Sequence, residues 1–320
     1  MGAMLRNNFA ELLADGLDEI VAQWKEFKMP ALEYTQVYNI KTSDQAFEQD
    51  IEMAGTPPQV ETGESEPVIY EDAIQGGSKR YTHLKYTLGT RVSHELLQDD
   101  RYGIVKQVPD AHTRSGQFVR EQVAWNAACN NGFTTSSSTT DGLALYSNVH
   151  PLLGGTGATG ALPLPTAAYT TAGTYPNRPA TDIDLSFSAV QTMLNQFKRL
   201  VDGVGMPINI KPKFLVIPPE LDYLASEILG SSLKPGVANN DINSLLKYGL
   251  QVMTVTYITS TSTWFAFAGK EDHKLKFFER EAFSTDYADD FDTGTLKMKS
   301  QQRFSCGASV WTGLWGSNGP

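Results

Sequence analysis

The residues best suited to chemistry lie together in the segment DGLALYSNVHP, at positions 141–151. It contains Asp141, Ser147 and His150, the residue types that serve as orienting carboxylate, nucleophile and general base in acyl transfer. A serine and a histidine three residues apart in a loop often arise by chance, and nothing nearby supplies an oxyanion hole. A hydrolase that uses Ser147 and His150 is therefore one hypothesis, and a structural loop is the simpler one.

Other catalytic and metal-binding signatures are incomplete. The run GGTGATG at 154–160 lacks the preceding strand and the lysine of a phosphate-binding loop, and no G-x-S-x-G elbow occurs. Acidic runs at 99–100 and 289–292 offer oxygen ligands but not the spacing of a calcium loop, so solvated turns are the simpler interpretation. The sequence predicts no enzyme activity.

The cysteines and histidines do not form a recognisable metal site. Cys129 and Cys306 are far apart in the sequence, and the five histidines do not cluster at ligand spacing. Since cysteine is usually buried, we expect two buried free thiols. The sequence therefore predicts neither a metal nor a cofactor.

Composition indicates a globular protein with an acidic surface. Of the 320 residues, 41% are hydrophobic and 19% charged, and 26 basic against 36 acidic side chains give a formal charge of −10. This balance argues against a dedicated nucleic-acid-binding protein, because affinity for phosphate comes from Lys and Arg. No run of 18 apolar residues and no secretory signal occurs, so we expect a soluble protein made in the cytoplasm.

The first third of the chain predicts a helix and a long acidic excursion. Residues 7–28 carry apolar side chains at three- and four-residue steps, the period of an amphipathic helix. Residues 44–78 hold nine acidic residues, no Lys or Arg, and many Gly and Pro, which exclude a long helix. Residues 81–88 alternate as a strand does. We expect a hairpin-like arm, either a solvated loop or one that docks on a basic surface of another subunit.

The rest of the chain mixes helices and strands. Ser93 is a helix cap, and Pro109 starts a second helix that runs to about 131 and should be covered on more than one side. Residues 132–180 read as long loops or an insertion. Helices and strands alternate over 182–282, with strands at 213–218, 250–258, 264–268 and 275–280, and 295–315 reads as a long strand or hairpin. The fold class is α+β.

Three stretches resemble the major capsid proteins of tailed bacteriophages with the Hong Kong 97 fold, especially the Mu-like head-subunit group. They are YTHLKYTLGTRVSHELLQDD (81–100), DGLALYSNVHPLLGG (141–155), and GMPINIKPKFLVIPPELDYLASEIL (205–229) together with the closing WTGLWGSNGP (311–320). The second is similar to the group's D-G-x-x-L-F-S-x-x-H segment, with Tyr146 where phenylalanine is usual.

The resemblance implies a definite architecture. Residues 1–43 would form an N-terminal arm and 44–88 an extended β-hairpin loop. Residues 89–181 would form a peripheral domain with a long spine helix, 182–270 an axial domain, and 271–320 strands that return to the peripheral domain.

The resemblance also implies function and partners. Such a subunit would assemble with itself into pentamers and hexamers of an icosahedral head around double-stranded DNA, without sequence-specific contact and without a membrane. Portal, scaffold or decoration proteins are further expected partners, with assembly in the bacterial cytoplasm and a place in the virion. The chain has no long charged leader, so a separate scaffold protein is expected. Residues 44–78 contain no lysine, so an isopeptide cross-link from this loop is not expected.

Charge complementarity predicts intersubunit contacts between the acidic arm and basic side chains of a neighbour. The acidic side of this hypothesis is Glu61, Glu64 and Glu66; the basic side is Arg114, Arg120, Lys297, Lys299 and Arg303.

Three alternatives stay open at this point. An encapsulin-like bacterial shell protein would share the fold but enclose a cargo protein in place of DNA. A Ser147/His150 hydrolase would depend on both side chains. A head decoration protein is usually shorter and simpler than this chain.

Overall fold

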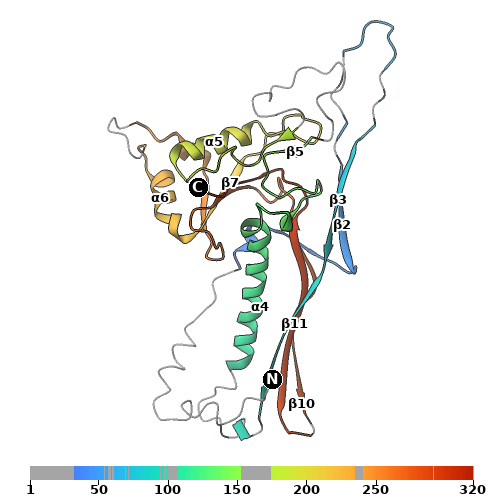
Figure 1. Ribbon diagram of the computed structural model, residues 1–320, viewed down its shortest axis with the longest axis vertical. Helices are drawn as coiled ribbons and strands as arrows, with labels where there is room; N and C mark the ends of the chain where they lie inside the picture. The colour runs from blue at the N-terminus through green and yellow to red at the C-terminus, as the bar shows by residue number, and fades with distance from the viewer. Residues whose placement is uncertain are drawn as a thin grey trace.

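The computed structural model describes residues 32–319, except residues 100–106, 153–173, 235–240 and the positions 54, 57, 58, 60, 69, 71, 94, 97, 98 and 291. The helix expected at 7–28 and the middle of the 132–180 insertion lie outside the described residues. Figure 1 shows a long helix against a long sheet, a second layered unit at one end of them, and a hairpin that reaches beyond that unit.

The first sheet has four strands in the order β1-β10-β11-β4. β10 and β11 form a long antiparallel pair, and β4 pairs antiparallel with the other side of β11. β1 adds to β10 in parallel and leaves β1 and β4 as the edges. The strand bounds are Asn39–Thr42 (β1), Leu275–Asp289 (β10), Leu296–Ala308 (β11) and Leu84–Val92 (β4).

Helix α4 (Val108–Trp125) crosses one face of this sheet and ends in a π-helical turn at Asn126–Asn130. Pro109 lies in its first turn, as the sequence predicted, because proline lacks only an N–H that is unpaired there anyway. The sheet packs on the helix at Gly116, and Tyr34 and Tyr257 contact it at Glu121 and Phe118, so the helix is covered on more than one side, as the sequence predicted. Phe118 nevertheless stays 45% exposed.

The contact between α4 and the sheet depends on alternation in β11 and on one glycine. Every second residue of β11 is buried beneath the helix, whereas the intervening residues face the opposite side, as a period of two requires. A Cβ on Gly116 would stand 2.5 Å from the ring of Phe283, so only glycine permits this approach. The buried set is Met298, Ser300, Gln302 and Phe304.

The second unit is a sheet in the order β12-β9-β7-β8 with helices α5 and α6 beside it. Val190, Leu194 and Phe197 recur along α5 at steps of four and three residues and pack into its core, as the period of a helix requires. The bounds are Leu314–Ser317 (β12), Trp264–Ala268 (β9), Pro212–Ile217 (β7), Gln251–Thr254 (β8), Phe187–Lys198 (α5) and Asp222–Gly230 (α6).

The hairpin consists of β2 (Phe47–Met53) and β3 (Gln75–Thr82), which pair antiparallel. The sequence predicted extended chain over 81–88, and this is confirmed except at His83. The chain divides at His83, so that β3 belongs to the hairpin and β4 to the first sheet. In Figure 1 the hairpin leaves the end of the first sheet and continues past α5.

Two other predicted strands differ in extent. The strand expected at 250–258 ends at Thr254, and the one at 295–315 is two strands, β11 and β12, in different sheets. The remaining short elements are α2 (Tyr34–Val37), β5 (His150–Pro151), β6 (Thr174–Tyr175) and 3-10 turns at Thr135–Ser137, Pro219–Leu221 and Ser244–Tyr248.

An aromatic stack joins the N-terminal described segment to the sheet and to α4. The ring of Tyr34 stacks on Phe277 at 4.8 Å, and Phe277 stacks on Phe304 at 5.0 Å. The Tyr38 hydroxyl donates to the Ala124 carbonyl at 2.8 Å. The segment before β1 is therefore fixed to the core of the first sheet.

Candidate assembly interface

The Asp141–Ser147–His150 segment forms a sealed polar cluster. His150 is fully buried, and its Nδ1 lies 2.6 Å from Asp141 Oδ2. Its Nε2 lies 3.2 Å from the Leu145 carbonyl and 3.1 Å from Asn177 Oδ1. Both ring nitrogens are therefore committed to partners other than Ser147.

The neighbours of this cluster have structural roles. The Ser147 hydroxyl accepts a hydrogen bond from the Val149 N–H at 3.3 Å, and Trp311 stacks on the His150 ring at 4.9 Å. Burial by itself raises the pKa of Asp141, but hydrogen bonds from His150 and Thr139 outweigh it and lower that pKa. A substrate could not reach the imidazole, so the arrangement is that of a structural pair that closes a loop.

The other candidates for chemistry are also accounted for. Asp290 forms an ion pair with Lys297 at 2.6 Å, and Asp100 lies outside the described residues. Within the described ranges no group of three or more His, Cys, Asp or Glu could hold a metal ion. Cys129 and Cys306 are free thiols, and burial raises the pKa of both.

The hairpin has an exposed apolar face. Along β2 the residues at odd positions face solvent, and these include Phe47, Ile51 (54% exposed) and Met53 (71%). Tyr70, beyond the pairing, is 93% exposed. Large apolar side chains on a projecting arm mark an interaction surface, because the isolated arm gains nothing from exposing them.

The predicted acidic residues lie on the same arm. Glu61, Glu64 and Glu66 are all exposed, and Glu66 Oε2 accepts a hydrogen bond from the Gly63 N–H at 2.8 Å. The sequence identified these acids but missed the apolar face, since it placed no strand at 47–53. The alternation of Phe47, Ile51 and Met53 with acidic residues was the available signal.

A cationic stripe lies on the face of the first sheet opposite α4. Lys85 of β4 is directly across from Arg303 of β11, and Arg91 is across from Lys297. Cross-strand partners share a face of a sheet, so these side chains and Lys299 lie on one side. The cationic stripe is Lys85, Arg91, Lys297, Lys299 and Arg303.

Part of the stripe forms no ion pair in the described part of the chain, although Arg303 of β11 also lies across from Glu281 of β10. Lys297 pairs with Asp290, and Lys299 approaches Asp286 at 3.5 Å. No ion pair within the described ranges involves Lys85, Arg91 or Arg303. Like charges directly opposite each other destabilise a sheet, so the pairs Lys85–Arg303 and Arg91–Lys297 favour an anionic partner.

The two arginines predicted on the spine helix lie elsewhere. Arg120 lies between α4 and the sheet, where it donates to Glu279 at 2.6 Å and to Gln302 at 2.7 Å. Arg114 is half-buried on the same helix. The structure therefore brings Lys297, Lys299 and Arg303 together on one face of the sheet, whereas Arg114 and Arg120 lie on α4. The sequence analysis missed Lys85 and Arg91, because their positions in the stripe depend on strand register.

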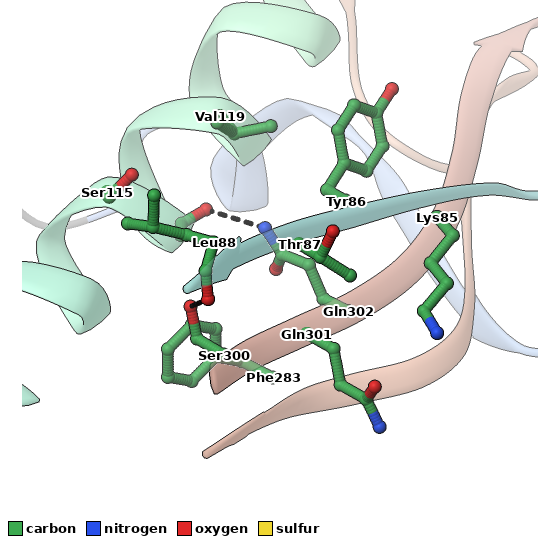
Figure 2. A pocket seen from close by; sticks show the side chains of 11 residues that line it. Lys85, Tyr86, Thr87, Leu88, Ser115, Val119, Phe283, Ser300, Gln301 and Gln302 are labelled. Atoms are coloured by element: carbon green, nitrogen blue, oxygen red, sulfur yellow. Dashed lines mark hydrogen bonds between the residues drawn. The ribbon is translucent and has the colours of Figure 1, made fainter. Parts of the chain in front are cut away.

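A groove of about 330 Å³ lies between α4 and the edge strand β4. Figure 2 shows Ser115 and Val119 of α4 on one side, Tyr86 and Leu88 of β4 on another, and Phe283 at its base. Gln302 closes one end by donating to the Gly116 carbonyl at 3.0 Å. The groove adjoins β4, an edge strand that pairs only with β11 among the described strands, and such an edge can pair with another chain.

None of the described helices is long and apolar enough to cross a membrane.

Comparisons with known proteins identify the fold. A structure from Mycobacterium phage Adephagia matches with a TM-score of 0.59 at 10% identity, over 100% of this chain and 99% of the other. The capsid of Myoviridae phage XM1 matches at 0.53 and 13% identity, over 100% and 99%. The capsid of bacteriophage JBD30 decorated with minor capsid protein trimers matches at 0.56 and 14% identity, over 81% and 100%. At these identities the likeness shows the fold, which is the α+β capsid fold of the Hong Kong 97 type.

The sequence comparisons add the family. No curated protein matches the sequence significantly. The family model described as phage capsid protein matches residues 77–316, which is most of the chain. The chain therefore belongs to the phage capsid protein family, and its role is structural rather than catalytic.

Proposed function

We propose that this chain is a major capsid subunit that assembles into the pentamers and hexamers of an icosahedral phage head around double-stranded DNA. The single observation that carries the proposal is the projecting hairpin, which exposes apolar and acidic side chains together: Ile51, Met53, Tyr70, Glu61, Glu64 and Glu66. A family member with such an arm reaches a stable state by covering it with another copy.

The contact runs from the hairpin of one copy to the cationic stripe of the next. A chain's own hairpin does not reach its own stripe. Lys79 at the start of the hairpin contacts Ala308 at the end of β11, and from there the arm runs away from Lys297. Glu61, Glu64 and Glu66 would face the stripe, and exposed Leu84 and Leu88 beside the groove would meet the apolar face. Such a contact is heterologous, because it joins two different surfaces of neighbouring copies. Repeated contacts of this kind form a ring when the rotation between copies closes.

The domain division is part of the same proposal. We assign residues 1–43 to the N-terminal arm, 44–88 to the extended loop, 89–181 and 271–320 to the peripheral domain, and 182–270 to the axial domain. β4 crosses the limit between the loop and the peripheral domain, and β12, which lies in the peripheral range, pairs with β9 of the axial range. Exposed Tyr223 and Leu224 on α6 are suited to contacts around a symmetry axis.

Further partners follow from the family. The JBD30 capsid carries trimers of a minor capsid protein, and we propose that decoration, scaffold and portal proteins bind this chain too. DNA would be enclosed without sequence-specific contact, consistent with the charge of −10. We place the chain in the Mu-like group, on the support of the Asp141–His150 segment.

Electron microscopy of the purified chain, with sedimentation, tests the proposal. Closed shells, tubes or capsomer rings are expected, with scaffold and portal supplied if the chain needs them. A chain that stays monomeric even with those proteins would contradict it. Particles from infected cells distinguish a head from an encapsulin-like shell, because a head contains DNA and a shell contains cargo protein.

Charge reversal of Glu61, Glu64 and Glu66 to lysine tests the contact itself. Assembly should fall strongly and its salt dependence should reverse, because the stripe then meets like charge that added salt screens. The matched variant with glutamine at the same positions keeps the size of the side chains and removes their charge. Its assembly should lie between that of the wild type and that of the lysine variant. Unchanged assembly and salt dependence in the lysine variant would refute the acidic contact.

A further inference from the structure

Two lysine side chains converge on one tyrosine beside the end of α5. Lys198 Nζ donates a hydrogen bond to the Tyr248 hydroxyl at 2.8 Å and lies 4.9 Å from the centre of the ring. Lys247 Nζ lies 5.1 Å from the centre of the same ring. Lys198 complements the negative end of the α5 dipole, but this does not explain the second ammonium group. Two cations at one ring repel each other, so an anion between them would stabilise the arrangement.

No described carboxylate neutralises these two lysines. Both are exposed, and no ion pair between described residues involves either of them. The sequence has no acidic residue between Asp184 and Asp202 or between Asp241 and Glu271, so α5 and the turn at Ser244–Tyr248 contain none. These two elements are therefore cationic, although the whole chain is acidic.

The exposed side of α5 continues from Lys198 as a row of hydrogen-bond donors. Ser188, Gln191, Asn195 and Lys198 are exposed and follow one another at steps of three, four and three residues, so they share one face of the helix. Hydroxyl, amide and ammonium groups are the side-chain groups that contact phosphate oxygens. None of the large apolar residues of α5 is exposed, whereas a protein partner would bury an apolar centre. The row therefore fits a phosphate backbone better than a protein surface.

A third lysine lies at the other end of this row. Lys234 Nζ lies 5.0 Å from the centre of the ring of Phe187, the first residue of α5. Phe187 and Lys198 are about three turns apart, so they lie on the same side of the helix, about 16 Å from each other along its axis. Figure 1 shows α5 on the side of the second unit that faces away from α4. The lysine patch is defined as Lys198, Lys234 and Lys247, with the donor row of α5 between them.

We propose that the lysine patch binds the phosphate backbone of duplex DNA. Lysine contacts phosphates as a point charge and does not read bases through them, so this binding is independent of sequence. In an assembled head the cationic stripe would be covered by the acidic arms of neighbours, which leaves the lysine patch for DNA. That the bound DNA is the enclosed genome rests on the proposed function, whereas affinity for DNA is a property of the single chain.

Fluorescence anisotropy of a short labelled DNA duplex, titrated with the unassembled chain at several salt concentrations, tests the patch. Lys198→Gln with Lys247→Gln should weaken binding about tenfold at low salt and lower the slope of log Kd against log salt by about 2, because two phosphate contacts are lost. Lys297→Gln with Lys299→Gln is the matched control. It removes the same charge from lysines that have carboxylate partners, and it should bind almost as the wild type does.

Two results of this titration would overturn the proposal. Binding that is unchanged in the variant of Lys198 and Lys247 would show that DNA does not contact the patch. Equal weakening in both double variants would show that net charge alone governs binding. All four side chains are at least partly exposed, so none of these substitutions removes a core contact.

Lysine footprinting locates the contact in assembled heads. The acetylation rates of Lys198 and Lys247 are compared by mass spectrometry between DNA-filled heads and heads without DNA, with Lys297 as the internal reference. Slower acetylation of the patch in filled heads alone is expected. Equal rates in both kinds of head would overturn the proposal, because a neighbouring subunit or solvent, rather than DNA, would then face the patch. If no heads form, the proposed function fails while the anisotropy result still decides the patch, so the two failures are distinguishable.

Discussion

The loop around His150 and the projecting hairpin differ in how far their side chains are accessible to a partner. The loop holds the residue types of catalysis, but His150 is fully buried and every polar atom of its ring has a structural partner. The hairpin holds no such constellation, yet it exposes apolar and acidic side chains to solvent. Residue type alone therefore does not locate function. Access to a partner does, and in a capsid protein the partner is another protein surface.

The largest expected effect comes from breaking the buried pair. His150→Ala removes a fully buried ring and one partner of the buried Asp141 carboxylate, which keeps only its hydrogen bonds with Thr139 and Leu143, and this should cost roughly 3–5 kcal/mol of unfolding free energy. Ser147→Ala should change it by less than about 0.5 kcal/mol, since Ser147 only accepts a backbone hydrogen bond. Chemical denaturation of both variants checks this. Similar losses for the two substitutions would contradict the assignment of His150 as the structural member.

A second buried histidine sharpens the comparison through pH. Burial, with Lys270 and Lys274 nearby, lowers the pKa of His273 to about 4, and its Nδ1 accepts from the Leu275 N–H at 3.2 Å. The unfolded state then binds more protons between pH 6.5 and 4. Stability should therefore fall as pH drops through this window, by about 3 kcal/mol in total.

Denaturation of wild type and His273→Gln across this window measures the effect. The variant lacks the titrating group, so its stability should depend less on pH between 6.5 and 4. Parallel curves for the two proteins would show that His273 does not titrate as its burial requires.

The smallest expected effect on stability lies in the cationic stripe, where stability and assembly should change in opposite directions. Lys85→Gln removes the like-charge pair with Arg303 and should raise the stability of the free chain by a few tenths of a kcal/mol, about 0.3. Assembly should weaken, because an anionic arm loses one of its partners. Thermal unfolding and sedimentation measure the two. A loss of stability together with unchanged assembly would show that Lys85 stabilises the free chain and does not bind a neighbour.

Local patterns in the sequence predicted much of the fold. The first-turn Pro109 of α4 is set by residues close in sequence, and it was predicted correctly. Ser93 caps the next segment as expected, since its hydroxyl accepts from the Leu96 N–H at 3.3 Å. Such features need no tertiary information.

Features that depend on distant partners were missed. The division of 81–88 at His83 follows from the pairing of β3 with β2 and of β4 with β11, which no local pattern contains. The cationic stripe exists only because the register puts Lys85 across from Arg303. The role of His150 depends on Asn177, which lies 27 residues further along the chain. Spacing alone showed only a serine near a histidine.

A charge exchange between the two surfaces tests the central account most directly. One variant carries Glu61, Glu64 and Glu66 changed to lysine, a second carries Lys85, Arg91 and Arg303 changed to glutamate, and a third carries both sets. Assembly is measured by sedimentation and electron microscopy under conditions in which the wild type forms particles. We predict that each single set loses assembly and that the combined variant recovers much of it. If all three variants fold and the combined one assembles no better than the single sets, the hairpin does not bind the stripe of a neighbour.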